Sequence, residues 1–503
     1  MTEPSPPAPR SRQQVLWAAA VVVALAAAVL VRLHSASALW LDEALSVNIA
    51  RLPLSEMPQA LRQDGSPPLY YLLLHGWMAV VGTGTDAVRS LSSVFAVACL
   101  PAVWWAGREL RDARTGWFAV LLLGSSPFVV RYSAETRMYS LILLMVLLGV
   151  VALERALRVP SLRRLWPITV LSGLLLLTHY WALYLLAVVG AGLLVLAVRG
   201  PSRTAARRCA VALAAGGLLF APWLPSFLFQ AKHTGTPWVA PPKSSAVLDT
   251  LSTWSGGRTL AGLLLVLLLV AGAVLALLAR RTPAGLLLSG RPDRTAGALL
   301  VAGLGTLVLG VVLAAIGSAG YAPRYSSVAV GPFLLAVALG LRLVAGNAGR
   351  LLLTVTVVLG LVGSAQVPLS HRRTQAAWLA REIRADLQQG DLVVYCPDQT
   401  GPAVSRLLPP QTEQVVYPTF GRPERIDWRD YAERNAQASP ADFAAKVLAR
   451  NPRTIWMVSR GDLLTFGDQC ARLDAALTRG RGSRTLVVAE RRRYAEHAEL
   501  IRY

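Results

Sequence analysis

Long apolar runs, separated by short segments that carry arginine, fill the first 369 residues of the chain. A helix that crosses the hydrocarbon core of a bilayer needs about 20 apolar residues, and eleven runs reach or approach this length. The runs cover residues 15–31, 87–107, 115–130, 138–153, 165–178, 180–198, 209–229, 259–279, 296–316, 326–345 and 351–368. The pattern predicts a polytopic α-helical membrane domain at 15–369, after a flexible tail at 1–14.

Residues 67–82 are also apolar, but they contain Pro67, Pro68, His75 and two glycines. We interpret them as an interfacial helix within a first outer loop at residues 34–86, because the proline pair favours an extended entry. If these residues formed a full span, the sidedness of every later loop would invert.

The placement of basic residues supports this topology. With the N-terminus in the cytoplasm, the inner loops are residues 108–114, 154–164, 199–208, 280–295 and 342–350. Together with the tail they hold 19 of the 29 basic residues before position 370, as the positive-inside rule expects. The uncharged stretch before Arg199 has to be two short helices that turn near His179. We therefore predict a multi-pass plasma-membrane protein with a cytoplasmic N-terminus and an extracytoplasmic C-terminal domain.

The last 134 residues, 370–503, have the composition of a soluble domain, with 21 basic and 16 acidic residues. Helical patterns at 374–388 and 440–450 alternate with strand patterns at 391–396, 454–459 and 485–490, which predicts a small α/β domain. The strands lack a Gly-rich nucleotide fingerprint, so no cofactor is assigned. Cys396 and Cys470 both lie in this domain, and a disulfide between them is permitted if the domain is outside the cytoplasm.

Composition narrows the class of protein. Charged residues make up 16% of the 503 positions and hydrophobic residues 54%, whereas a soluble domain has roughly 25% charged residues. A soluble globular enzyme and a disordered protein are therefore excluded. The net charge of +22 is explained by arginines that orient apolar spans, and no basic stripe with stacking aromatics indicates nucleic-acid binding.

Two alternatives concern short motifs. Ala36 and Ala38 are spaced like a signal-peptidase site, but further spans follow, so we favour a membrane anchor over a cleaved signal peptide. The sequence contains no C-x-x-C or H-E-x-x-H pattern, so a zinc site is unsupported.

Adjacent acids, Asp42 and Glu43, follow Trp40 directly after the first run. A charged pair at a membrane boundary is costly unless it is solvated or functional. A solvated interfacial pair and a catalytic pair are both compatible with the sequence alone.

Other polar and aromatic residues are expected on the same outer face. They are Asp64 and Tyr70, Arg89, then Glu135, Arg137 and Tyr139, then His179 and Tyr180, and finally Arg324 and Tyr325. A structural alternative exists for several of them: an aromatic belt for Tyr70, an ion pair for Glu135 and a hydrogen-bonded structural role for His179.

Together these residues predict one site. A carboxylate can take a proton from an acceptor hydroxyl, and arginines can hold a phosphate in a bidentate way. Arg324 precedes a predicted helix start, which is a favourable place for an anion. A sugar linked to a lipid phosphate fits these needs, with its tail among the helices and its phosphate as the leaving group.

The sequence Trp40-Leu41-Asp42-Glu43-Ala44, then Pro67-Pro68-Leu69, Arg89 and Arg137-x-Tyr139, resembles glycosyltransferase family 39 over roughly residues 10–370. These polytopic GT-C enzymes include protein O-mannosyltransferases, aminoarabinose lipid A transferases and bacterial membrane mannosyltransferase-like members. The resemblance implies inverting transfer of a sugar, mannose as the first candidate, from a polyprenyl-phosphate donor to an extracytoplasmic acceptor hydroxyl.

The same resemblance suggests roles for individual residues. Asp42 would be the general base, and Glu43 would orient Asp42 or bind the acceptor. Arg137 and Arg324 would bind the donor phosphate, and Arg89 would bind substrate or be structural. No metal is assigned; if one were needed, the acidic pair could contribute oxygen ligands.

The chain also departs from the family pattern. Ser66 stands where the protein mannosyltransferases usually have His before Pro-Pro, and the C-terminal domain does not resemble their β-trefoil module. The acceptor, whether glycan, lipid or protein, therefore stays open.

Two other classes of function remain as alternatives. A transporter or lipid-carrier flippase predicts inverted repeats or charges at mid-span depth. A non-catalytic scaffold predicts that Asp42→Asn leaves the phenotype intact.

Overall fold

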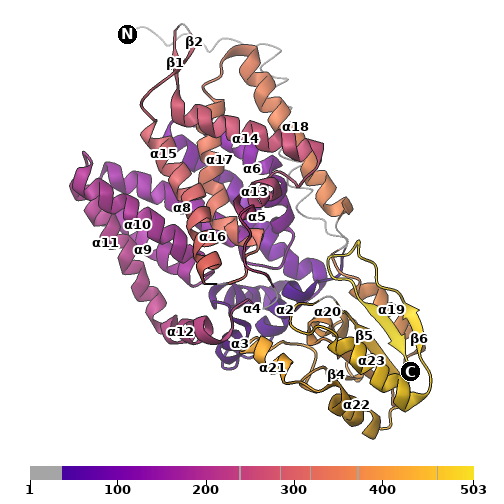
Figure 1. The fold of residues 1–503 in the computed structure, drawn as a ribbon. Helices are drawn as coiled ribbons and strands as arrows, with labels where there is room; N and C mark the ends of the chain where they lie inside the picture. The colour runs from indigo at the N-terminus through magenta and orange to yellow at the C-terminus, as the bar shows by residue number, and fades with distance from the viewer. Residues whose placement is uncertain (1–36, 237–238, 284, 318, 371–372, 462) are drawn as a thin grey trace.

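The computed structural model describes residues 37–503 except for 237–238, 284, 318, 371–372 and 462. The tail at 1–14, the predicted first span at 15–31 and Ala36 lie outside the described residues. The described chain forms a long bundle of helices, and an α/β domain built from its C-terminal part continues the bundle at one end (Figure 1).

Eight helical segments of the described chain are long and apolar enough to cross a membrane. Five of them are α5 (Thr85–Leu110), α8 (Tyr139–Arg158), α10 (Ala182–Arg199), α14 (Leu260–Leu278) and α18 (Gly346–Ser370). The other three segments are each built from consecutive shorter elements. The first joins α11 (Arg203–Phe220), η1 (Ala221–Trp223) and α12 (Leu224–His233), and the second joins α15 (Arg294–Leu300), η2 (Val301–Gly305) and α16 (Thr306–Ile316). The third joins η3 (Pro323–Ser326) and α17 (Ser327–Leu341). Each coincides with a predicted span, which confirms the polytopic helical fold.

Two predicted spans differ from regular membrane helices. The run at 115–130 forms α6 (Ala113–Ser125) and α7 (Pro127–Ser133), which are bent by 63° relative to each other. Ser126 caps α7, and Pro127 lacks the amide hydrogen that would continue α6. The run at 165–178 forms α9 (Leu162–Leu176), whose 15 residues are short for a span. The described residues thus hold eight regular spans, or nine if the bent pair counts as one.

Three short helices lie between the bundle and the C-terminal domain (Figure 1). They are α2 (Leu41–Ala50), α3 (Met57–Asp64) and α4 (Leu69–Val81), and a further short helix, α13 (Ala246–Trp254), precedes α14. With 13 residues α4 is too short to cross a bilayer, so the predicted short helix at 67–82 is present. The Leu69 amide donates to the Leu177 carbonyl (2.9 Å), which fixes the start of α4 against the end of α9.

The five loops predicted to face the cytoplasm contact one another at the end of the bundle remote from the C-terminal domain (Figure 1). Arg342 pairs with Asp112, and Arg111 pairs with Asp293 at 3.4 Å. Glu109 binds Arg155 at 2.7 Å. The Arg208 guanidinium donates to the Pro160 carbonyl, and the hairpin of β1 (Ala279–Thr282) and β2 (Gly285–Leu288) lies at the same end. The alternation of inner and outer loops agrees with the predicted topology, while the identity of the inner side stays a prediction.

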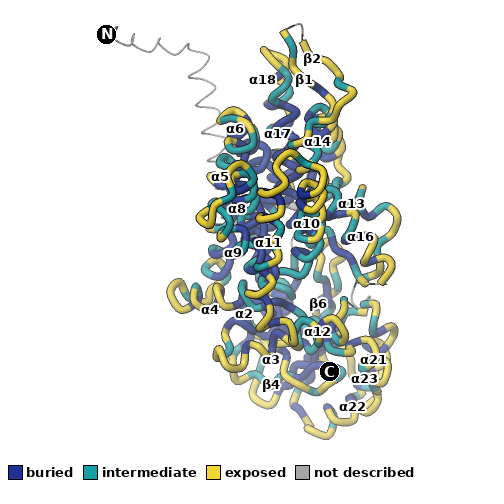
Figure 2. Tube along the Cα trace, turned by 90° about the vertical axis from the view of Figure 1, so that its left-hand side faces the viewer, coloured by how far each residue is buried: buried dark blue, intermediate teal, exposed yellow. Residues whose placement is uncertain are grey.

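Helix α17 is the centre of the bundle, and all of its residues are buried (Figure 2). Its backbone approaches the backbone of α14 closely at Gly340. A Cβ atom added at Gly340 would lie only 1.8 Å from the Gly272 carbonyl oxygen, so a larger residue would not fit there. Since η3 leads directly into α17, this close packing fixes the position of Arg324 at the end of the bundle next to the C-terminal domain.

The C-terminal domain contains a five-stranded mixed sheet in the order β4-β3-β5-β7-β6. The strands are β3 (Leu392–Cys396), β4 (Glu413–Val416), β5 (Ile455–Ser459), β6 (Thr485–Val488) and β7 (Glu499–Arg502). β3 pairs in parallel with β4 and β5, and β7 pairs antiparallel with β5 and β6. The helices are α19 (Ala376–Asp386), α20 (Gly401–Ser405), α21 (Tyr431–Ala436), α22 (Pro440–Ala449) and α23 (Gln469–Arg481). This confirms the predicted α/β domain.

Alternate residues of β3 face two separate cores. Val394 and Cys396 pack into one cluster, while Val393 and Tyr395 pack into the other. A strand that is buried on both faces reads as a continuous apolar run, which is why the sequence pattern located β3 and β5. Cys396 at the end of β3 forms a disulfide with Cys470 at the start of α23.

Removing this disulfide with the Cys396→Ala/Cys470→Ala double variant should destabilise the domain by about 4 kcal/mol, because the bond closes a long loop in the unfolded chain. The measurement is thermal unfolding of the purified protein. Thiol labelling of denatured protein should give two reactive cysteines without reductant and four after reduction. The Cys99→Ala/Cys209→Ala variant serves as the control, and four reactive thiols before reduction would contradict the bonded state.

Candidate functional site

Helix α2 begins at the acidic pair and gives its two members different surroundings. Trp40 is extended, and its amide donates to the Glu43 Oε2 at 3.4 Å, as in a capping box. Neighbouring positions on a helix point about 100° apart, so Asp42 and Glu43 face different parts of the protein.

Glu43 is fully buried and its carboxylate is engaged by the protein. Arg89 on α5 donates to Oε1 at 2.8 Å and to Oε2 at 2.6 Å. The Thr136 amide donates to Oε1 at 2.9 Å. Arg89 also donates to the carbonyls of Ser37 and Ala38. The geometry therefore favours an orienting role for Glu43 over acceptor binding, and the structural alternative for Arg89.

Asp42 is the more open acid, with 18% of its side chain exposed. Its Oδ2 lies 3.4 Å from the Arg324 Nη2. The Arg324 guanidinium lies over the rings of Trp40 and Tyr325, at 5.6 Å from each centroid. Asp42 is thus a carboxylate beside a cation that aromatic rings hold in place.

A second arginine, Arg137, approaches from the loop between α7 and α8. Its Nη1 donates to the Ser46 Oγ at 3.1 Å and to the Tyr71 hydroxyl at 3.4 Å. Tyr71 in turn donates to Asp64 Oδ2 at 3.0 Å. Burial raises the pKa of Asp64, while the nearby Arg137 lowers it. Asp64 and Arg137 therefore belong to one polar network next to α2.

Aromatic rings form a wall of the site. The His179 ring lies 6.2 Å from the Tyr139 ring and 5.5 Å from the Tyr325 ring. Burial, together with the nearby Arg137 and Arg324, lowers the pKa of His179 to about 3. The Trp181 amide donates to Nδ1 of this neutral ring, so its proton resides on Nε2.

Several buried polar atoms of this region have no hydrogen-bond partner among the described residues. They are Trp40 Nε1, Arg131 Nε, Glu135 Oε2, Thr136 Oγ1, Arg137 Nε, Tyr139 OH and Arg324 Nε. Native proteins leave few buried polar groups unsatisfied, so such a concentration is typical of a site that receives a polar ligand.

Three predicted site residues have protein partners instead. The Tyr180 hydroxyl binds Gln230 and accepts from the Trp223 indole at 3.0 Å. The Tyr70 hydroxyl is 2.9 Å from the Ser92 Oγ. Glu135 forms an ion pair with Arg373. For Tyr70 and Tyr180 the geometry favours the structural interpretation, because their hydroxyl groups are already used, whereas Glu135 pairs through Oε1 and keeps Oε2 without a partner in the described residues.

Arg373 is a residue that the sequence analysis missed. It follows α18, and its guanidinium lies 5.9 Å from the centroid of the Trp40 ring, which Arg324 also contacts. Burial lowers the pKa of Arg373 to about 10. The available signal was a basic residue just after the last span on the predicted outer side, against the charge pattern of that side.

The described residues contain no group of three or more His, Cys, Asp or Glu side chains placed to hold a metal ion. Of the acidic pair, Glu43 is occupied by Arg89, so the two acids do not share a common ligand position.

Sequence comparison identifies a family match over part of the chain. Residues 65–225 match the model of the dolichyl-phosphate-mannose-protein mannosyltransferase family, which confirms the predicted resemblance. The matched range includes Arg89, Arg137 and His179 but neither the acidic pair nor Arg324. No curated protein matches the chain by sequence.

Solved structures show that the fold is that of GT-C glycosyltransferases. The apo structure of ArnT from Cupriavidus metallidurans aligns with a TM-score of 0.65 at 13% identity, covering 97% of this chain and 98% of that one. Mycobacterial arabinofuranosyltransferase AftD gives a TM-score of 0.54 at 16% identity, covering 98% of this chain and 41% of its own. The Archaeoglobus fulgidus oligosaccharyltransferase AglB, in complex with an inhibitory peptide and a dolichol-phosphate, gives 0.50 at 11% identity over 89% and 70%.

Replacing Glu43 by Ala should strongly destabilise the protein, because the buried Arg89 guanidinium loses its counter-charge. Breaking a buried ion pair in this way costs about 3–5 kcal/mol. Thermal unfolding of purified protein in detergent measures the effect. Asp468→Ala, which removes the exposed partner of Arg472, is the matched control and should change the unfolding temperature little. Equal unfolding temperatures for the two variants would contradict the anchoring role.

Proposed function

We propose that this protein is an inverting glycosyltransferase that moves a sugar from a polyprenyl-phosphate donor to an acceptor hydroxyl. The partial family match and the GT-C fold support a glycosyltransferase. The AglB structure contains a dolichol-phosphate, which supports a lipid-phosphate donor for this fold. Mannose is the first candidate sugar because of the family that residues 65–225 match.

The observation that carries the proposal is the open Asp42 carboxylate beside Arg324, surrounded by buried polar atoms without partners. All other charges in the described spans lie close to the helix ends, as Glu154 does in α8 and Arg203 does in α11. A transporter would instead place charges at mid-span depth. The site is therefore suited to chemistry at one membrane face.

In the proposed reaction Asp42 takes the proton from the acceptor hydroxyl. The hydroxyl oxygen attacks the anomeric carbon of the sugar, and the bond from that carbon to the phosphate oxygen breaks with both electrons going to the phosphate. The sugar is transferred with inversion, and the polyprenyl phosphate leaves.

Arg324 and Arg137 are the proposed partners of the leaving phosphate. A guanidinium stays charged and presents a planar fork to phosphate oxygens. Each has an Nε without a partner in the described structure, so part of each fork is available to a ligand. The Tyr139 hydroxyl and His179 Nε2–H are further donors on the same wall. Stabilising the charge that develops on the leaving group is usually the largest catalytic contribution.

An apolar cavity of about 540 Å³ between α8, α9, α10 and α15 could accommodate the lipid tail. On α8 it begins at Val146, seven residues beyond Tyr139, which is roughly 10 Å along the helix axis. It continues to Leu157 and Arg294 at the end remote from Asp42. A polyprenyl chain in this cavity would run from the phosphate site into the bilayer.

The proposed location is the plasma membrane, with the N-terminus in the cytoplasm and the acceptor outside. The acceptor is a glycan, lipid or protein of the cell envelope. Ser66, which replaces the usual His of the mannosyltransferases, is buried, and its carbonyl accepts from Gln230. It therefore belongs to the scaffold under α4.

The Asp42→Asn variant should lose about 100-fold or more of the transfer rate, because the amide cannot accept the proton. Membranes that contain equal amounts of each variant are given radiolabelled polyprenyl-phosphate mannose, then arabinose- and glucose-linked donors. Asp249→Asn removes another outer acid, the partner of Arg258, and should leave transfer unchanged. Equal transfer by wild type and Asp42→Asn would remove Asp42 as the base.

Replacing Arg324 or Arg137 by Lys should lower kcat about 10-fold or more, since the charge remains but the planar fork is lost. Arg258→Lys, at the exposed pair with Asp249, is the matched control. Steady-state kinetics with varied donor concentration measures the effect. Wild-type kcat in both lysine variants would argue against these arginines as phosphate ligands.

A further inference from the structure

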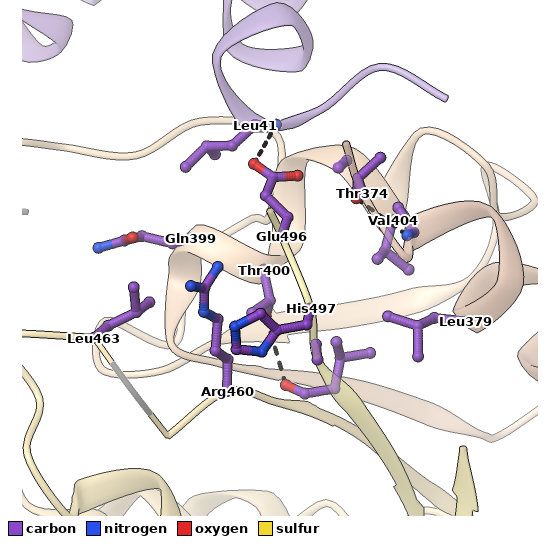
Figure 3. A pocket seen from close by; sticks show the side chains of 14 residues that line it. Leu41, Thr374, Leu379, Gln399, Thr400, Val404, Arg460, Leu463, Glu496 and His497 are labelled. Carbon is purple, nitrogen blue, oxygen red and sulfur yellow. Dashed lines mark hydrogen bonds between the residues drawn. The ribbon is translucent and has the colours of Figure 1, made fainter. Parts of the chain in front are cut away.

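The C-terminal domain reaches the helix that carries Asp42. The Leu41 amide, in the first turn of α2, donates to the Glu496 Oε1 at 2.7 Å, across 455 residues of sequence (Figure 3). The first amides of a helix have no partner inside the helix, and an acceptor from elsewhere has to satisfy them. Here the Glu43 carboxylate, within α2, accepts a hydrogen bond from the Trp40 amide. The Glu496 carboxyl group, in the C-terminal domain, accepts one from the Leu41 amide.

The backbone of Glu496 is fixed on both sides. Its amide donates to the Arg373 carbonyl at 2.8 Å, and its carbonyl accepts from the Gln375 amide at 2.9 Å. Arg373 is itself tied to the bundle through Glu135. The carboxyl group that touches α2 is therefore held by a segment that is attached to the membrane domain as well as to the sheet.

A small cavity of about 40 Å³ lies between α2 and the domain, and Glu496 forms part of its wall (Figure 3). Arg460 and His497 line the same cavity from the domain, and Leu41 lines it from α2. The groups of Arg460 and, one residue beyond Leu41, Asp42 carry charge near Glu496, and the His497 ring lines the same cavity. Burial, together with the nearby Asp42, raises the pKa of Glu496 to about 8, against the lowering effects of the Leu41 amide, Thr374 and Arg460.

We propose that Glu496 is a positioning residue for Asp42, because its carboxyl group caps the helix that carries the base. Sugar transfer then depends on the contact between the C-terminal domain and α2. This inference rests on the proposed function of Asp42. A small displacement of a catalytic group lowers a rate substantially, so loss of the cap should reduce kcat rather than donor affinity.

The state of the Glu496 carboxyl adds a second signature. Below a pH of about 8 the group is neutral in the folded protein and accepts the Leu41 hydrogen bond as a carboxylic acid. Above this pH the carboxyl group ionises in a buried position next to Asp42, which disfavours the contact between the C-terminal domain and α2. Activity should therefore fall as the pH rises through about 8 in wild type.

The test compares Glu496→Ala and Glu496→Gln in the full-length protein. An Ala side chain cannot accept the Leu41 hydrogen bond, so exchange of the Leu41 amide with deuterium should speed up about 10-fold or more and kcat should fall about 10-fold. Gln keeps an acceptor oxygen and resembles the neutral acid. The Gln variant should match wild type at neutral pH and lack the decline above pH 8.

Glu499→Ala is the matched control, because Glu499 is a partly buried acid on β7 that lies opposite Ser459 of β5. It should alter neither the Leu41 amide nor kcat. Thermal unfolding and labelling of the Cys396–Cys470 pair establish that each variant is folded.

Three outcomes would overturn the proposal. They are unchanged Leu41 exchange in Glu496→Ala, unchanged kcat despite faster exchange, and a persistent alkaline decline in Glu496→Gln. If wild type transfers no sugar from any donor, the proposed function fails, and the exchange measurement alone decides whether Glu496 caps α2.

Discussion

The buried ion pair of Glu43 and Arg89 is the interaction on which the rest of the site depends. Burying two charges is costly, and it is tolerated only when further hydrogen bonds satisfy both groups. Here the Thr136 and Trp40 amides donate further hydrogen bonds to the Glu43 carboxylate. The Arg89 guanidinium donates to carbonyl groups of the segment before α2. One cluster thus joins α2, α5 and the loop before α8. Because Glu43 is satisfied inside, the adjacent Asp42 is directed toward the arginines at the membrane face.

The two ends of the bundle use arginine differently. At the end remote from the domain, Arg342, Arg111 and Arg155 each have a carboxylate partner, so the loops are joined by ion pairs. At the domain end, Arg89 and Arg373 also have carboxylate partners, but Arg324 faces the partly exposed Asp42 and Arg137 contacts hydroxyl groups. The first arrangement neutralises charge within the protein. The second leaves positive charge available to an anion, which is the electrostatic requirement of a phosphate site.

Hydropathy located the helices because lipid leaves a membrane segment few alternatives to a helix. The pattern did not show the bend at Ser126, since one Pro can begin a helix as well as interrupt one. Strands β3 and β5 were predicted from their apolar runs, whereas β7, with the sequence ELIR, carries charges at both ends and gave no such signal. The motif around Asp42 was readable because its residues are close in sequence.

Other parts of the site depend on contacts that no local pattern records. His179 and Tyr180 are adjacent, yet the turn sends His179 toward Tyr139 and Tyr180 toward Gln230. Arg373 and Glu496 join the site only because the C-terminal domain folds back onto α2. Their chemistry was visible in the sequence, but their positions are set by packing over hundreds of residues.

The contacts of the C-terminal domain with α2 and α3 bear on the choice of acceptor. Besides Glu496, the domain contacts Asn48 on α2 through Arg406 and the Glu424 carbonyl, and Gln63 on α3 through the Trp428 amide. If Asp42 is the base, as proposed, an acceptor would approach it beside these contacts, and the proposed donor would approach from the bundle. Donor recognition would then reside in the helices, where the family match lies, and acceptor choice in the domain. Under the proposed function, the covering domain could differ between acceptors as long as the contact of Glu496 with α2 is kept, because Arg137 and Arg324 belong to the bundle.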